Sequence, residues 1–142
     1  MSSFITRAAT CVAVAAVAVA GAAGTVNAAE SVHIDAEEVF GGVSTFTSTI
    51  DGCASGTVTN AGDRVTGGPR FGTFTGFKVF SCEGGGGFVV RLSAKFDETG
   101  STGTWVVVDS SGSLAGLHGS GTLVGTPTEG GINDVYDGVL RP

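Results

Sequence analysis

The chain of 142 residues is long enough for one domain, and its composition excludes several classes of protein. Charged residues make up only 14%, and thirteen acidic against seven basic residues give a net charge of −6. This balance lacks the basic footprint of a nucleic-acid-binding protein, so we expect no nucleic-acid partner. The hydrophobic content of 42% excludes a disordered chain, and the 25 glycines follow no three-residue period, which excludes collagen.

Residues 1–28 have the pattern of a secretory signal peptide. Arg7 supplies the early positive charge, residues 8–23 are uncharged and mainly Ala and Val, and Val26-Asn27-Ala28 has small residues where a signal peptidase reads. The apolar run is shorter than the roughly 20 residues that span a bilayer. We therefore expect cleavage after Ala28 or Ala29, a secreted, extracellular domain over 29–142, and no membrane association once the signal is removed.

Two cysteines, Cys53 and Cys82, remain after the expected cleavage. In an oxidising compartment they allow a single pairing, which we interpret as a structural disulfide. In the chain-entropy model such a bridge stabilises the fold by roughly 3–4 kcal/mol. The chain has no Cys-x-x-Cys pair and only two histidines, His33 and His118, so no metal site is expected.

Beyond residue 30, apolar and polar residues alternate with the period of two that is typical of half-buried strands. The clearest case is Phe88–Phe96, where Leu92 lies on the apolar face and Arg91 on the polar face. We predict seven more strands in segments with similar signals: around Val32, Ile34 and Ala36, and at Ser44–Ile50, Ala54–Thr59, Thr73–Cys82, Thr104–Asp109, Gly121–Thr126 and Ile132–Leu140.

Short clusters of turn-forming residues separate these eight segments, for example at 51–52, 61–63, 84–87, 99–103, 110–113 and 129–131. Such short links favour an antiparallel meander. Eight strands suffice to close a small barrel whose interior holds side chains or one small ligand. We predict an all-β fold with a single antiparallel barrel of about eight strands, and a two-sheet β-sandwich is the alternative that fits the same pattern.

The segment 103–121, which begins Gly103-Thr104-Trp105, resembles part of the allene-oxide-cyclase and dirigent-like barrel proteins. In that group a strand enters a glycine-rich turn and returns as a strand; Gly112, Leu114, Gly116 and Gly119 match this turn, whereas Ser110 and Ser111 replace the usual Gly and Thr. The strand that ends in a cysteine (Phe77–Cys82) and the Asp134-x-Tyr136-x-Gly138 motif resemble the uncharacterised secreted bacterial branch of this group. The resemblance implies an eight-stranded antiparallel barrel, but it places no catalytic residue on this chain.

Candidates for catalytic chemistry are few. A catalytic triad needs a base beside a nucleophile, and no Gly-x-Ser-x-Gly motif is present. His33 alternates outward, and His118 lies in the glycine-rich turn, where a surface role outweighs a site role. The acidic pairs Glu37-Glu38 and Asp97-Glu98 fall at strand ends, where solvated charges are expected. We assign no catalytic residue and no cofactor.

The strand Ile132–Leu140 carries the strongest signal for a binding site. Its face with Ile132, Tyr136 and Leu140 also carries Asp134. If this face points into the barrel, the carboxylate needs a partner, because an unpaired buried charge is costly. Lys78 or Arg70 can supply it. Either the pair is structural, near the rim, or Asp134 is a polar anchor for a ligand in the mouth of the barrel.

These observations favour a secreted, non-catalytic β-barrel that binds a small apolar or amphipathic ligand or presents a surface to a partner. His118, Asp134 and Tyr136 are the candidate ligand-binding residues. The alternatives are a cofactor-free cyclase or isomerase that uses a pocket carboxylate, and a secreted inhibitor or adhesion module. An enzyme of this kind needs an open barrel with an inward acid or tyrosine, whereas a fully packed interior would remove both the ligand and the cyclase hypotheses.

Overall fold

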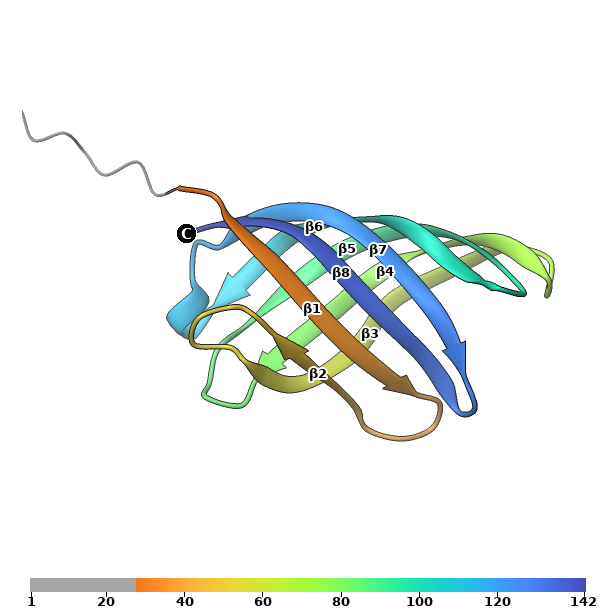
Figure 1. Cartoon of the computed structure of the whole chain (residues 1–142), viewed down its shortest axis with the longest axis horizontal. Helices are drawn as coiled ribbons and strands as arrows, with labels where there is room; N and C mark the ends of the chain where they lie inside the picture. The colour runs from red at the N-terminus through yellow and green to blue at the C-terminus, as the bar shows by residue number, and fades with distance from the viewer. Residues whose placement is uncertain (1–27) are drawn as a thin grey trace, which may run out of the picture.

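The protein is a closed antiparallel barrel in which the eight strands follow one another in chain order (Figure 1). The structure, a computed structural model, describes residues 28–142, so nearly all of the expected signal peptide lies outside the described residues. Closure by pairing of the first strand with the last excludes the β-sandwich alternative. The elements are β1 (Glu30–Val39), β2 (Ser44–Ser48), β3 (Ser55–Gly67), β4 (Phe71–Cys82), β5 (Gly87–Asp97), β6 (Gly100–Ser111), the 3₁₀ helix η1 (Gly112–Leu114), β7 (His118–Thr128) and β8 (Gly131–Arg141).

The predicted alternation sets which side chains enter the barrel. On β5, Leu92 is 2% exposed and points inward, while its neighbour Arg91 is exposed. On β8, Asp134, Tyr136 and Leu140 are all buried. The expected faces of these two strands are therefore confirmed, because successive side chains of a strand point to opposite sides of the sheet.

Several strands are longer than predicted, since residues expected to form turns continue the ladder. The predicted separator at 61–63 is wrong: it lies inside β3, which runs on to Gly67. The register between β3 and β4 shifts between Ala61 and Arg64, and Gly62 there has a φ of 63°. The extra residue is thus absorbed as a β-bulge, a device that bends a strand without ending it.

The links between strands define two ends of the barrel (Figure 1). We call one of them the hairpin end; it carries links 40–43, 68–70, 98–99 and 129–130. The terminal end carries both ends of the described chain, links 49–54 and 83–86, and η1 with the segment that follows it. Leu114 of η1 joins the core and Leu117 packs against it.

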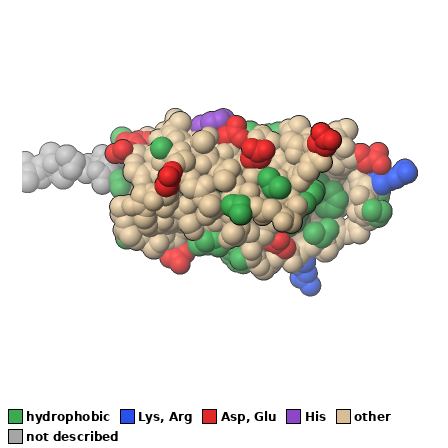
Figure 2. Space-filling view, turned by 90° about the horizontal axis from the view of Figure 1, so that it is seen from below, with side chains coloured by type: hydrophobic (Ala, Val, Ile, Leu, Met, Phe, Trp, Pro, Cys, Tyr) green, Lys and Arg blue, Asp and Glu red, His purple; other side chains and the backbone are tan. Residues whose placement is uncertain are grey.

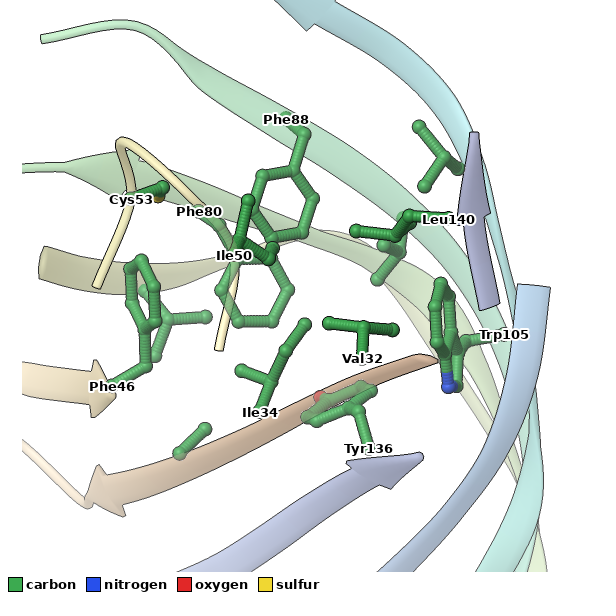
Figure 3. Close-up of a cluster of buried hydrophobic side chains, with 14 of the residues drawn as sticks. Val32, Ile34, Phe46, Ile50, Cys53, Phe80, Phe88, Trp105, Tyr136 and Leu140 are labelled. Carbon is green, nitrogen blue, oxygen red and sulfur yellow. The ribbon is translucent and has the colours of Figure 1, made fainter. Parts of the chain in front are cut away.

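Aromatic side chains form a buried cluster inside the barrel (Figure 3). Phe80 and Phe88 stack with ring centroids 4.7 Å apart, and Phe46 and Tyr136 meet Phe80 edge-on at 5.1 and 5.5 Å. Offset-stacked and edge-to-face contacts of this kind are the favoured geometries of aromatic pairs. None of these four rings lines the cavity of about 240 Å³ at the hairpin end or the cavity of about 180 Å³ at the terminal end.

The disulfide between Cys53 and Cys82 is confirmed, and it joins link 49–54 to the end of β4 across 29 positions of sequence. We expect replacement of both cysteines by serine to lower the free energy of unfolding by about 3 kcal/mol, because the bridge restricts the unfolded chain. In a domain of this size, that loss of free energy corresponds to a fall in Tm of well over about 5 °C. Calorimetry of the wild-type protein and the double variant checks this, and two titratable thiols in wild-type protein purified without reductant would contradict it.

Candidate functional site

A pocket of about 240 Å³ opens at the hairpin end of the barrel. Most of its wall is apolar and comes from six different strands or their links: Phe40, Val65, Phe74, Leu92, Ala94, Phe96, Leu123 and Ile132. Its polar lining includes three charged side chains, Glu38, Lys78 and Asp134. An apolar cleft with a few convergent polar groups is the usual form of a small-molecule site.

The three charged side chains are buried, although they come from strands on opposite walls. Glu38 on β1 and Asp134 on β8 lie on neighbouring strands, where Ala36 pairs with Asp134 and Glu38 with Ile132. Lys78 is on β4, halfway round the barrel, and its side chain reaches across the interior. We call these three residues the acid–lysine cluster. Their exposures of 8%, 4% and 6% mean that the two carboxylates depend on the single ammonium group of Lys78 for compensation.

Within the cluster the two carboxylates are bound unequally. Lys78 Nζ donates a hydrogen bond to Glu38 Oε1, whereas Asp134 Oδ2 lies 3.8 Å from the same nitrogen. That separation is an ion pair but exceeds hydrogen-bond length. Nζ also lies 5.7 Å from the centroid of the Phe74 ring, within the range of a cation–π contact. Asp134 is therefore the less firmly held of the two acids.

The expected partner of Asp134 was Lys78 or Arg70, and the structure selects Lys78. Arg70 instead lies in the exposed link between β3 and β4, 3.3 Å from the exposed Glu98. The Asp134 carboxylate lies over Gly125 of β7, at a place where a Cβ would collide with it and with the Ser101 hydroxyl. The absence of a side chain at this position gives the carboxylate its space beside the pocket.

Burial raises the pKa of Asp134 to about 7, and the negative charge of Glu38 adds to this effect, while Lys78 opposes it. The physical reason is that the ionised form loses hydration and has no cation of its own. A carboxyl group that titrates near neutral pH lies at the wall of a pocket, where it can hold or release a proton.

Tyr136, two residues further along β8, points the same way and is fully buried. Within residues 28–142, its hydroxyl is the one side-chain polar atom sealed from solvent that has no hydrogen-bond partner. Burial raises the pKa of this phenol well above its ordinary value, and the charges of Asp134 and Glu38 raise it further. A neutral donor without an acceptor therefore lies beside the ionisable Asp134.

The pKa of Asp134 predicts an unusual pH dependence of stability. A carboxyl group with a raised pKa binds its proton more tightly in the native state than in the unfolded chain, so its contribution is full below about pH 4 and is lost as the pH rises to about 7. We expect the wild-type protein to lose stability relative to Asp134→Asn over this window and the difference to be constant above it. Urea titrations between pH 4 and pH 8 measure it; a difference that does not change with pH would contradict the assignment.

Glu38 is the site residue that sequence reasoning missed. Glu37 and Glu38 were both expected to be solvated at a strand end, and this is wrong for Glu38, because β1 extends to Val39 and keeps Glu38 on the inward face. The signal was present in the alternation of Val32, Ile34 and Ala36, which the next even position continues. Asp97 and Glu98 are exposed, as expected.

His118 does not join this site. It is exposed at the start of β7 and pairs with Arg141 at the terminal end, while Asp134 pairs with Gly125 further along the same two strands. A second cavity, of about 180 Å³, lies at the terminal end between Val32, Ile50, Leu114 and Leu140, and His118 does not line it either. His33, also exposed, forms a hydrogen bond of 2.6 Å between its Nδ1 and Asp137 Oδ1 on the outer surface.

In the part of the chain that the structure describes, no group of three or more histidine, cysteine or acidic side chains is arranged to hold a metal ion. No helix among residues 28–142 has the length and hydropathy to cross a bilayer. No protein-family model, curated protein or solved structure matches the chain. The function must therefore be argued from the pocket itself.

Proposed function

We propose that the protein is a secreted binding protein that holds a small amphipathic molecule in the hairpin-end pocket. The observation that carries the proposal is the position of the acid–lysine cluster at the wall of an otherwise apolar pocket. Apolar walls bind the body of such a molecule through area removed from water, and the buried charges orient its polar end. The volume of the pocket, about 240 Å³, limits the ligand to small molecules.

Exposed apolar side chains at the mouth support this proposal. Phe40 and Val65, which line the pocket, are 71% and 60% exposed, and Val43 in link 40–43 and Phe71 at the start of β4 are similarly exposed. Hydrophobic side chains gather toward the end away from the N-terminal residues in Figure 2. Contiguous apolar surface on a soluble protein commonly marks a binding site, because exposing it to water is otherwise unfavourable.

A neutral aromatic alcohol, 2-phenylethanol, tests the pocket without assuming a charge on the ligand. We expect it to shift the NMR signals of residues around Phe74, Leu92 and Leu123 in the disulfide-bonded protein. Ala94→Leu, which adds volume inside the pocket, abolishes these shifts. Ser93→Leu makes the matched change on the outward face of the same strand and leaves them intact.

Two outcomes would contradict the proposal: an absence of shifts at millimolar alcohol, or shifts that persist in Ala94→Leu. Because added volume in a packed interior costs stability, the variant is first compared with wild type by thermal unfolding. If Ala94→Leu does not fold, Ser101→Leu narrows the pocket from β6, where the native side chain is only half-buried.

The same geometry supports a second candidate, a cofactor-free isomerase or cyclase of the kind that the resemblance to allene-oxide-cyclase and dirigent-like proteins suggests. Asp134 lies in the pocket with a pKa of about 7, which suits a general acid or base at neutral pH. The probe is 5-nitrobenzisoxazole, whose C–H proton passes to a base as its N–O bond breaks to release a phenolate. Catalysis that rises with pH through about 7 and disappears in Asp134→Asn would support this candidate; rates equal to those in buffer would exclude base catalysis on this probe.

Export is part of the proposal, because the Cys53–Cys82 disulfide is consistent with an oxidising compartment. We expect the protein in the culture medium to begin at Ala29 or Glu30. N-terminal sequencing checks this, and full-length protein that starts at Met1 and stays in the membrane fraction would contradict it.

A further inference from the structure

The acid–lysine cluster is unbalanced in charge. When Asp134 is ionised, two carboxylates share one ammonium group, which leaves one negative charge without a cation inside the barrel. Lys78 gives its hydrogen bond to Glu38, so Asp134 meets the ammonium group only at ion-pair distance, 3.8 Å away, at the pocket wall; its other polar neighbours are Glu38 and Tyr136, which bring no positive charge. Buried charges are normally paired and hydrogen-bonded. Among residues 28–142, this carboxylate therefore shares its only cation with Glu38, and an occupant of the pocket can supply a second one.

The groups around Asp134 do not supply a second cation. From β1 it faces Glu38, from β4 Lys78 and from β8 Tyr136, and these are the charged or titratable groups that affect it among residues 28–142. On β6 and β7, the Ser101 hydroxyl and Gly125 lie nearby, and neither carries charge. Tyr136 can donate its unpartnered hydroxyl proton to the ionised carboxylate, but it brings no positive charge.

We propose that the occupant of this pocket is a small aromatic or alkyl amine, whose ammonium group pairs with the Asp134 carboxylate while its apolar body packs on Phe74 and Phe96. This inference rests on the proposed function and adds the chemical class of the ligand. An anionic ligand fits the pocket poorly, because Lys78 is the one basic residue that lines it and is already paired. A cation completes two ion pairs instead, and aromatic rings at the wall favour it further.

Ligand binding is coupled to the proton on Asp134. An ammonium group pairs with the ionised carboxylate, so at a pH below about 7 the bound amine must displace the proton. The competent state then falls to roughly one hundredth of the protein at pH 5, and the apparent affinity falls in proportion. A neutral ligand that takes no part in this pairing has no such dependence.

The test compares two ligands of the same shape, 2-phenylethylamine and 2-phenylethanol, by calorimetric titration of the disulfide-bonded protein. At pH 8 we expect the amine to bind at least tenfold more tightly, because charge-assisted hydrogen bonds are the stronger kind. At pH 5 this preference disappears. At pH 7, titrations in buffers of different ionisation enthalpy detect the release of a fraction of a proton on binding of the amine.

Asp134→Asn removes the charge and keeps the shape, so it abolishes the preference for the amine while 2-phenylethanol still binds. Asp97→Asn removes the same charge from an exposed site at the hairpin end and leaves the preference unchanged, which excludes general attraction to an acidic protein. Equal binding of amine and alcohol, or a preference that survives in Asp134→Asn, overturns this inference but leaves the proposed function standing. If neither ligand binds, the proposed function fails as well.

Discussion

Lys78→Met destabilises the barrel by about 3–5 kcal/mol at neutral pH, which is the usual cost of removing one partner from a buried ion pair. Methionine keeps an unbranched side chain of similar length, so the change removes the ammonium group and little apolar packing. Glu38 and Asp134 then face each other in the interior with no cation between them. Urea unfolding at pH 7 measures the loss.

Two controls distinguish the loss of the Lys78 charge from the loss of its packing. Lys95→Met makes the same substitution on the outer face of β5, where the side chain is exposed, and it changes stability by less than about 0.5 kcal/mol. Neutralising the whole cluster, as Lys78→Met with Glu38→Gln and Asp134→Asn, recovers much of the loss, because no unpaired charge remains buried. Lowering the pH likewise restores stability to Lys78→Met, since protonation discharges the carboxylates. A loss that is independent of pH would show that packing, not charge, is the cause.

The fold could be predicted from the sequence because local alternation of apolar and polar residues determines the strands and their inward faces. Alternation in Phe88–Phe96 and Ile132–Leu140 identified the inward faces, and all eight strands occur where the pattern placed them. Strand ends were less accessible, since residues such as Gly62 and Asp63 have turn-like propensities in isolation. In the barrel their neighbours on β4 hold them in a bulged ladder. Tertiary pairing overrides local preference there.

The site could be predicted from the sequence only in part, because it depends on which strands face each other across the interior. Sequence pattern identified Asp134 and Tyr136 as inward and gave Lys78 as one of two partners. It could not select Lys78 over Arg70, since that choice depends on closure of the barrel, which places β4 opposite β8. Sequence reasoning missed Glu38 because it assumed that acidic residues near strand ends are solvated. A charge can continue an apolar face when a partner meets it from the opposite wall.

The neighbours Arg91 and Leu92 provide the most direct check of the register on which the pocket depends. Leu92 is 2% exposed, packs in the core and lines the pocket, so Leu92→Ala is expected to cost about 2–5 kcal/mol through lost burial and the cavity that remains. Arg91 is exposed on the opposite face, and Arg91→Ala is expected to cost less than about 1 kcal/mol.

Urea titration of both variants measures this difference. The two residues are neighbours on one strand, so the comparison isolates the direction in which each side chain points. Retention of the wild-type m-value would show that the change is one of stability and not of the denatured state. A shift of β5 by one residue would exchange the two side chains between core and solvent, since the period of a strand is two. Arg91→Ala would then be the damaging variant, Leu92 would leave the pocket wall, and the pocket as described here would not exist.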